Sequence, residues 1–257
     1  MSEPLLETRG LTKTFGGLKA VQKVDLSIGA NRIVSVIGPN GAGKTTFFNC
    51  LSGIYRPDAG TMLLDGHNIA GRASHEVCRR GLSRTFQNIR LFPEMSVLEN
   101  VLVAQFQHRS LSPLSLLFHS RSFCAAEGQS HDEALAFLEF VGLASYADSV
   151  SGSLAYGLQR RLEIARALAT RPRLLLLDEP AAGMNPQETI EMVHLISRIR
   201  ERGLAILLIE HHMKVVMTIS DEILVLDHGV PIAHGAPEKV RNDPQVIKAY
   251  LGEEVTH

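Results

Sequence analysis

The stretch "GPNGAGKT", residues 38–45, combines glycines with a lysine and a hydroxyl in the spacing G-x-x-x-x-G-K-[ST]. Glycines let the main chain curl so that successive N–H groups point into one cavity and hold phosphate oxygens. In this pattern Lys44 reaches the β- and γ-phosphates of a nucleotide, and the Thr45 hydroxyl can hold Mg²⁺. A buried strand before the stretch and a helix after it argue against a chance glycine-rich turn. The predicted contact residues of this phosphate loop are Gly38, Pro39, Asn40, Gly41, Ala42, Gly43, Lys44, Thr45 and Thr46.

Two carboxylates, Asp178 and Glu179, directly follow the apolar run "LLLL" at residues 174–177. A carboxylate at the end of a buried parallel strand lies at the sheet edge where ligands bind. We expect Asp178 to orient Mg²⁺ or its waters, and Glu179 to polarise an attacking water. A polar surface loop is the weaker alternative, because a phosphate loop lies upstream. Together the two motifs predict a P-loop nucleotidase.

The strands that must position these residues are visible as apolar runs. "RIVSVI" (32–37), which leads into the phosphate loop, predicts a strand buried on both faces. "RLLLLDE", "LAILLIE" and "EILVLD" predict three more buried strands separated by helices, and hence a parallel sheet. Asn185, followed by Pro186 and Glu188, predicts a capped helix between the first two of these strands. After Asp227 the chain is expected to turn into a final short strand.

The N-terminal part has a different pattern. Val24, Leu26 and Ile28 alternate with polar residues, as in a half-buried antiparallel strand. The pair Asp65-Gly66 between two extended segments predicts a hairpin. These patterns predict an antiparallel β subdomain.

Residues 88–150 are predicted to form an inserted helical subdomain in a single domain whose core is 1–87 and 151–257. Within the insertion a helix is expected with Ser130 as its cap and Gly142 at its end. Its apolar positions are Ala134, Leu135, Leu138 and Val141. The stretch 107–130 has no clear period; packing on its own subdomain is preferred over contact with a partner for Leu114, Leu116, Leu117 and Phe118.

Composition limits the function. The 257 residues are 45% hydrophobic, enough for a large core, and the net charge of −1 gives no electrostatic case for nucleic acid. The three cysteines fit no metal spacing and indicate reduced thiols of a cytoplasm, with Cys50 a core residue. The N-terminus has no signal-peptide pattern, and the apolar runs are too short for a membrane helix. We therefore expect a soluble chain that acts at a membrane only through partners.

The order of these motifs, over essentially the whole chain, resembles the ATP-binding subunit of an ABC transporter. The resemblance implies an α/β ABC ATPase fold. This fold combines a P-loop core with a parallel sheet, an N-terminal antiparallel β subdomain and an inserted helical subdomain. It implies that Phe15 in "TKTFG" stacks on adenine, with Val21 also at the nucleotide. Gln87 in "RTFQN" would sense Mg²⁺ and the γ-phosphate, and His211 in "LLIEHHM" would contact the γ-phosphate. A lone phenylalanine is more often core and a lone glutamine surface, so only the order of motifs singles them out. The implied catalytic residues are Glu179, His211, Lys44 and Gln87, with Thr45, Gln87 and Asp178 at the metal.

A departure from the family occurs in "SLAYGLQRRLEIARAL" (153–168). The family pattern Leu-Ser-Gly-Gly-Gln closes over the γ-phosphate held by the other subunit, and here Leu154, Ala155, Tyr156 and Gly157 stand at its first four positions. The serine hydroxyl is absent, but the main-chain amides and the helix N-terminus remain to favour a phosphate. In the loop after Glu179, Asn185 replaces the aspartate that is usual in the family. The interpretation is a functional but altered site that pairs with a different ATPase subunit; an ordinary helix start is the alternative.

Within the family the closest likeness is to Liv-type subunits of branched-chain amino-acid uptake, through "RTFQNIRLFPEMSVLENVLVAQ", "LDEPAAGMNP" and "PEKVRNDPQVIKAYLG". The resemblance implies ATP and Mg²⁺ as cofactors, and ATP is favoured over GTP because no N-K-x-D motif appears. The implied partners are a second ATPase subunit, transmembrane permease subunits and, indirectly, a solute-binding protein outside the cell. The implied location is peripheral, at the cytoplasmic face of the inner membrane. Alternatives are a urea or amide importer, an extractor, a soluble ABC ATPase, and a non-hydrolytic clamp, against which Glu179 and His211 argue.

Overall fold

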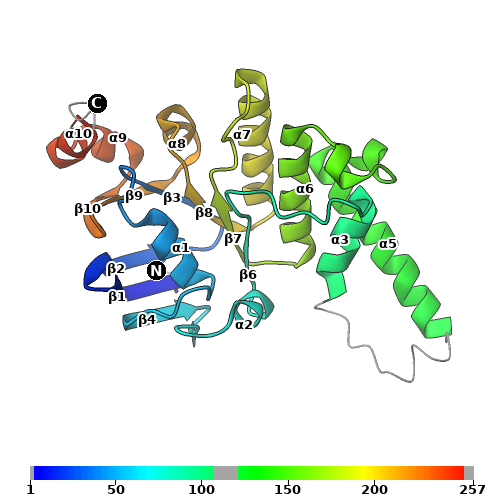
Figure 1. The fold of residues 1–257 in the computed structure, drawn as a ribbon, viewed down its shortest axis with the longest axis horizontal. Helices are drawn as coiled ribbons and strands as arrows, with labels where there is room; N and C mark the ends of the chain where they lie inside the picture. The colour runs from blue at the N-terminus through cyan, green and yellow to red at the C-terminus, as the bar shows by residue number, and fades with distance from the viewer. Residues whose placement is uncertain (1–2, 107–120, 252–257) are drawn as a thin grey trace. The chain divides into compact units, whose positions relative to one another are not determined.

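The computed structural model describes residues 3–106 and 121–251. The chain divides into two compact units, called here the first unit (residues 1–84 and 173–257) and the second unit (residues 85–172). Figure 1 draws the ribbon along the chain from blue to red. The predicted single domain with an insertion at 88–150 stays a prediction. Leu114, Leu116, Leu117 and Phe118 lie outside the described residues.

The first unit contains an antiparallel sheet of four strands in the order β2-β1-β4-β5. Val24, Leu26 and Ile28 are buried, which confirms the alternating pattern. Asp65 and Gly66 both have left-handed backbones, as a tight hairpin turn between β4 and β5 requires. The strands are β1 (Leu6–Phe15), β2 (Leu18–Ile28), β4 (Ala59–Leu64) and β5 (His67–Asn68).

A second sheet of six strands, in the order β10-β9-β3-β8-β7-β6, forms the centre of the first unit. Its strands run parallel except for β10, which is antiparallel to β9. The predicted parallel sheet is therefore confirmed, and β3, β7 and β8 are buried along their whole length. The strands are β3 (Ile33–Ile37), β6 (Leu82–Arg84), β7 (Leu174–Asp178), β8 (Ala205–Ile209), β9 (Glu222–Asp227) and β10 (Val230–Gly235).

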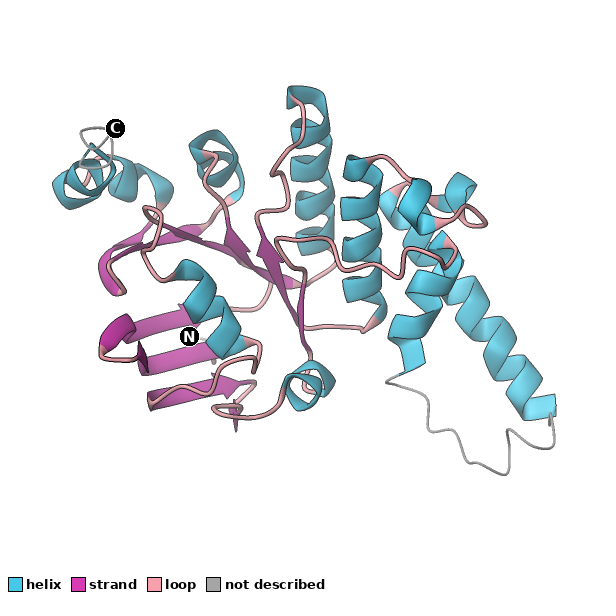
Figure 2. Cartoon of the chain, viewed as in Figure 1, coloured by secondary structure: helices cyan, strands magenta, loops and turns pink. Residues whose placement is uncertain are grey.

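Helices cover both faces of this six-stranded sheet (Figure 2). Phe47 and Phe48 of α1 pack in one core with the four-stranded sheet and one face of the six-stranded sheet. Val216 of α8 and Val240 of α9 pack on the other face. Asn185 caps α7, because its side chain accepts from the Glu188 N–H at 3.0 Å. The helices are α1 (Lys44–Leu51), α2 (Ser74–Arg79), α7 (Pro186–Glu201), α8 (Met213–Ile219), α9 (Pro237–Arg241) and α10 (Pro244–Leu251).

The described part of the second unit contains helices and no strand longer than an isolated bridge. The predicted apolar register of its longest helix is confirmed, since Ala134, Leu138 and Val141 are buried and Gly142 follows with a left-handed backbone. The prediction that Ser130 caps this helix is wrong. The described helix spans Arg121–Val141 and continues through Ser130, because no proline interrupts the turns before Ser130. The helices are α3 (Val97–Gln105), α5 (Arg121–Val141) and α6 (Tyr156–Ala169), with 3₁₀ turns at Ala144–Tyr146 and Ser151–Ser153.

Among the described residues no helix has both the length and the apolar character to cross a membrane.

Candidate nucleotide-binding site

Three loops that carry predicted site residues leave the same edge of the six-stranded sheet. Val36 of β3 pairs with Ile209 of β8, and Ile209 pairs with Asp178 of β7. The phosphate loop follows β3, Glu179 follows β7, and His211 follows β8. Because parallel strands end at one edge, the sheet brings these loops together although they are far apart in sequence.

The charge of Lys44 lies against the main chain of the phosphate loop. Its Nζ donates hydrogen bonds to the carbonyl oxygens of Gly38 at 2.5 Å and Pro39 at 2.8 Å. Lys44 is also the first residue of α1, whose N-terminal N–H groups favour an anion. The side chain of Thr45 is exposed in the same turn, and Thr46 is half-buried. This arrangement can hold the phosphates of a nucleotide.

Two glycines of the phosphate loop are required by the close approach of neighbouring strands. A Cβ added at Gly43 would lie 2.1 Å from the carbonyl oxygen of Ala20 on β2. One added at Gly38 would lie 2.0 Å from the carbonyl oxygen of Leu226 on β9. Gly41 also has a left-handed backbone, but a Cβ there would meet nothing within 4 Å. The loop is therefore held between β2 and β9.

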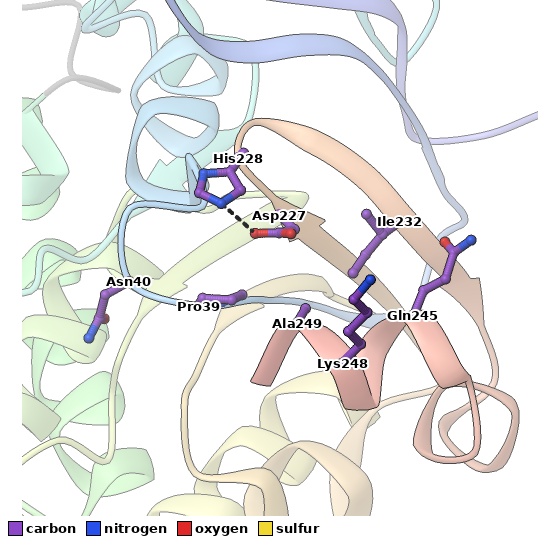
Figure 3. A pocket seen from close by; sticks show the side chains of 8 residues that line it. All are labelled: Pro39, Asn40, Asp227, His228, Ile232, Gln245, Lys248 and Ala249. Carbon is purple, nitrogen blue, oxygen red and sulfur yellow. Dashed lines mark ion pairs between the residues drawn. The ribbon is translucent and has the colours of Figure 1, made fainter. Parts of the chain in front are cut away.

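The phosphate loop also borders a pocket of about 560 Å³ (Figure 3). The β9–β10 turn and α10 form the other walls, and Asp227 and His228 of that turn form an ion pair at 3.7 Å. The lining residues are Pro39, Asn40, Asp227, His228, Ile232, Gln245, Lys248 and Ala249. The C-terminal helix thus lies beside the loop that carries Lys44.

Asp178 is held by a buried arginine that sequence reasoning missed. Its Oδ2 accepts a hydrogen bond from Nη2 of Arg84 at 2.7 Å, and both side chains are buried. Nη1 of Arg84 donates to Asn49 of α1 at 2.6 Å and to Ser52, the C-cap residue of α1, at 3.1 Å. Arg84 therefore links the carboxylate at the end of β7 to α1. An arginine in a three-residue strand carries no sequence signal for this role.

Glu179 and His211 face each other at the edge of the sheet. Oε1 of Glu179 lies 3.6 Å from Nδ1 of His211. Glu179 has a left-handed backbone with φ 50°, which is costly for a residue with a Cβ and recurs at functional sites. The ring centroids of His211 and His212 are 4.5 Å apart, so the two neighbouring rings lie side by side. The carboxylate and the imidazole are placed to act on the same group.

Phe15, predicted to stack on adenine, and Val21, predicted to lie at the nucleotide, differ in exposure. Phe15 is 41% exposed, and its ring meets Tyr55 edge-on with centroids 5.2 Å apart. The Lys13 ammonium lies 5.2 Å from the centroid of the same ring. Val21 is fully buried in the core, which does not favour the nucleotide contact predicted for it.

In the second unit, α6 begins inside the stretch that departs from the family pattern. Tyr156 is its first residue, and Ala155 stands at the cap without a side-chain hydrogen bond to the helix. Leu154 is buried, whereas Ala155 and Tyr156 are exposed. The first N–H groups of a helix have no intrahelical partner, so Gly157 and its neighbours can offer donors to an anion.

Arg160 of α6 is only 2% exposed. Sequence reasoning did not foresee its burial. Its guanidinium donates to the Tyr156 hydroxyl at 2.8 Å, to the Phe86 carbonyl at 2.6 Å, and to the Gln87 carbonyl. It also pairs with Glu163 at 3.1 Å. Burial raises the pKa of the Glu163 carboxyl. The side chain of Gln87 is exposed, and its main chain is thus held by α6.

The oxygen-bearing residues fit a magnesium ion. Mg²⁺ prefers oxygen ligands and takes one or two carboxylates together with substrate phosphates and waters. The Asp178 carboxylate and the exposed Thr45 hydroxyl supply oxygens in the first unit. No cluster of three histidine, cysteine, aspartate or glutamate side chains that could hold a metal ion occurs in the described part of the chain.

The chain was compared with known families and structures. A family model described as "ABC transporter" matches residues 21–182, and one described as "Branched-chain amino acid ATP-binding cassette transporter" matches residues 230–256. The high-affinity branched-chain amino acid transport ATP-binding protein BraF of Pseudomonas aeruginosa is 53% identical, covering 98% of this chain and 100% of that protein. LivG of Escherichia coli, described in the same words, is 52% identical with the same coverage.

A solved structure agrees with the fold. The ADP conformation of MJ1267, an ATP-binding cassette of an ABC transporter, superposes with a TM-score of 0.84 and 31% identity, covering 98% of this chain and 100% of that one. The predicted fold class is therefore confirmed. The ABC transporter match spans more than half of the sequence, and the two relatives span nearly all of it. The chain belongs to the ABC transporter family, as one of its ATP-binding, ATP-hydrolysing subunits.

Proposed function

We propose that this chain hydrolyses ATP to drive an importer of branched-chain or related amino acids. The observation that carries the proposal is the single sheet edge that presents the phosphate loop, Asp178 and the Glu179–His211 pair. The names of the relatives and the match at residues 230–256 support the amino-acid class.

Binding is assigned to the first unit. The N–H groups of the phosphate loop and the Lys44 ammonium hold the phosphates, and the exposed ring of Phe15 stacks on adenine. Thr45 and Asp178 hold Mg²⁺, with Gln87 as a further ligand. When bound, the ion neutralises charge on the transferring phosphate. Arg84 keeps the Asp178 carboxylate in one orientation through its bond at 2.7 Å.

Hydrolysis is assigned to Glu179 and His211. The Glu179 carboxylate accepts a hydrogen bond from the attacking water and increases its nucleophilicity. His211 contacts the γ-phosphate, and its Nδ1 faces Glu179 at 3.6 Å. The ring thereby keeps the carboxylate directed at the water beside the phosphorus. Preorganised charge of this kind is the main source of catalysis in phosphoryl transfer.

The second unit would act on a neighbouring subunit. The turn from Leu154 to Gly157 contacts the γ-phosphate held by a second ATPase subunit, through main-chain donors at the start of α6. Ala155 lacks the hydroxyl of the common pattern, which favours a heterodimer with a different ATPase. The dimer works on transmembrane permease subunits at the cytoplasmic face of the inner membrane, and a solute-binding protein delivers the amino acid from outside.

Hydrolysis is tested with Glu179→Gln, because an amide cannot act as the base. The variant should bind ATP, stop releasing phosphate, and accumulate as an ATP-bound dimer on size-exclusion chromatography. Glu188→Gln, which changes the α7 capping box instead, is the matched control and should keep its turnover. Normal turnover by the Glu179 variant would remove Glu179 from the mechanism and assign the base to another residue. No phosphate release by the unaltered chain would instead favour the non-hydrolytic clamp.

The transport role is tested by purifying the tagged chain from its native membrane and identifying the bound proteins by mass spectrometry. We expect transmembrane permease subunits and a second ATPase, and uptake of labelled leucine that stops in the Glu179→Gln strain. Permeases with uptake of urea or an amide would assign the related importers, and copurification without any membrane protein would assign a soluble ABC ATPase.

A further inference from the structure

The residue before His211 is a completely buried carboxylate that none of the roles above uses. Glu210 follows β8 directly and is 0% exposed. A carboxylate without water is costly unless several donors surround it. Within the described part of the chain its neighbours are main-chain N–H groups and the ring of His212, and no lysine or arginine pairs with it. The Glu210 carboxylate is therefore stabilised by the main-chain donors around it, and it holds those donors in place.

The two oxygens of Glu210 hold two different loops. Oε1 accepts the N–H of Ala181 at 3.0 Å. Oε2 accepts the N–H of His211 at 3.1 Å and that of His212 at 3.3 Å, and Nδ1 of His212 lies 3.4 Å away. Ala181 is two residues after Glu179, so one side chain connects the loop that carries Glu179 with the loop that carries His211.

These loops need such a connection. Glu179 has a left-handed backbone that the surroundings must maintain, since a residue with a Cβ does not keep it unaided. The Glu179 N–H bonds the Ile209 carbonyl at 2.9 Å, which ties its main chain to β8 just before Glu210. The 3.6 Å approach between the Glu179 and His211 side chains therefore depends on main-chain positions that Glu210 holds on both sides.

We propose that Glu210 is a positioning residue for hydrolysis: it holds the main chains of the two loops so that Glu179 and His211 act on the same water and phosphate. The inference rests on the proposed function, because Glu179 and His211 have this task only if the chain hydrolyses ATP. Glu210 itself contacts neither nucleotide nor water in this mechanism.

The test uses Glu210→Gln in the full chain, with the proteins that copurify with it. An amide keeps the shape but offers one acceptor oxygen to three N–H donors, and its own NH₂ opposes them. We expect kcat to fall by about 100-fold with the KM for ATP unchanged, because misplacement by about an ångström has that effect on catalysis. The variant should also accumulate as an ATP-bound dimer, as expected for Glu179→Gln.

Asp221→Asn is the matched control. Asp221 lies in the same unit and accepts the N–H of Ile33 at 2.8 Å, at the opposite ends of β3 and β9 from the phosphate loop. This variant should lose thermal stability while its kcat stays within about twofold of the original. A purely structural role for Glu210 predicts the same behaviour for both variants, and that result would overturn the proposal.

The double variant separates this proposal from the proposed function. If Glu210 acts through Glu179, adding Glu210→Gln to Glu179→Gln should not lower the residual hydrolysis further. A further full loss would show an independent effect and reject the positioning role. Normal hydrolysis by Glu179→Gln alone would instead reject the role that the proposed function gives to Glu179. If Glu210→Gln does not bind ATP, we measure Glu210→Asp, which keeps the negative charge on a shorter side chain. A loss of kcat at constant KM in Glu210→Asp supports the proposal, and an unchanged kcat rejects it.

Discussion

The phosphate loop of the first unit and the start of α6 in the second unit are both turns proposed to contact phosphate, but they are built differently. The phosphate loop depends on backbone shape, since Gly38 and Gly43 leave no space for a side chain against β9 and β2. The start of α6 depends on one buried side chain, Arg160, which bonds Tyr156 and the carbonyls of Phe86 and Gln87. A turn held by its backbone is specified locally, whereas a turn held by a side chain depends on distant partners.

The largest effect is expected where charge meets phosphate. Lys44→Ala removes the cation bonded to the carbonyls of Gly38 and Pro39. We expect a loss of about 4 kcal/mol in transition-state stabilisation, or nearly a thousandfold in phosphate release, with the fold retained. Lys239→Ala, which removes an exposed lysine of α9, is the control. Phosphate release near the original rate in both would show that backbone shape alone suffices.

The next effect concerns the stability of the second unit. Arg160→Met removes the guanidinium that bonds the buried Glu163 carboxylate and the carbonyls of Phe86 and Gln87. Breaking one side of a buried ion pair should lower the free energy of unfolding by about 3 kcal/mol. Arg161→Met changes the neighbouring residue, whose Nη1 donates to the Val141 carbonyl at 3.4 Å, and should lower the free energy of unfolding far less. Equal denaturant midpoints for the two variants would contradict the dependence of this region on Arg160.

Two glycine substitutions test whether the backbone shape of the phosphate loop depends on its close approach to β2. Gly41→Ala and Gly43→Ala both place a Cβ on a left-handed backbone, which costs about 1–2 kcal/mol. Only Gly43→Ala also collides with the Ala20 carbonyl, so it should weaken ATP binding by about 2 kcal/mol more than Gly41→Ala. Isothermal titration with ATP measures the difference. Equal affinities would mean that β2 does not constrain the loop.

The smallest effect is expected at the base. Phe15→Ala should weaken ATP binding by about 1 kcal/mol, roughly fivefold, through the loss of stacking. Because the ring is 41% exposed, the melting temperature should change little. Phe92→Ala, an exposed aromatic of the second unit, is the control for surface truncation. An unchanged affinity together with a lower melting temperature would make Phe15 a support for Tyr55 instead.

The sequence by itself determined the parts that depend on neighbours in the chain. The phosphate loop, the buried strands β3, β7, β8 and β9, the Asp65-Gly66 turn and the Asn185 cap were all predictable, because periodicity, glycine and capping residues act over a few positions. Asp178 and Glu179 were found for the same reason. Ser130 was misread because a cap residue inside a longer helix looks the same as one at its start.

Only the tertiary structure decided which charged side chains are buried and with what partners. Arg84 meets Asp178 across 94 positions, and Arg160 meets Gln87 across 73. Glu210 bonds Ala181, which lies 29 positions earlier, and so joins two loops. No local pattern marks these residues, since a charge is buried only where distant main-chain donors, acceptors or opposite charges compensate its loss of water. That compensation exists only once the strands and helices have packed.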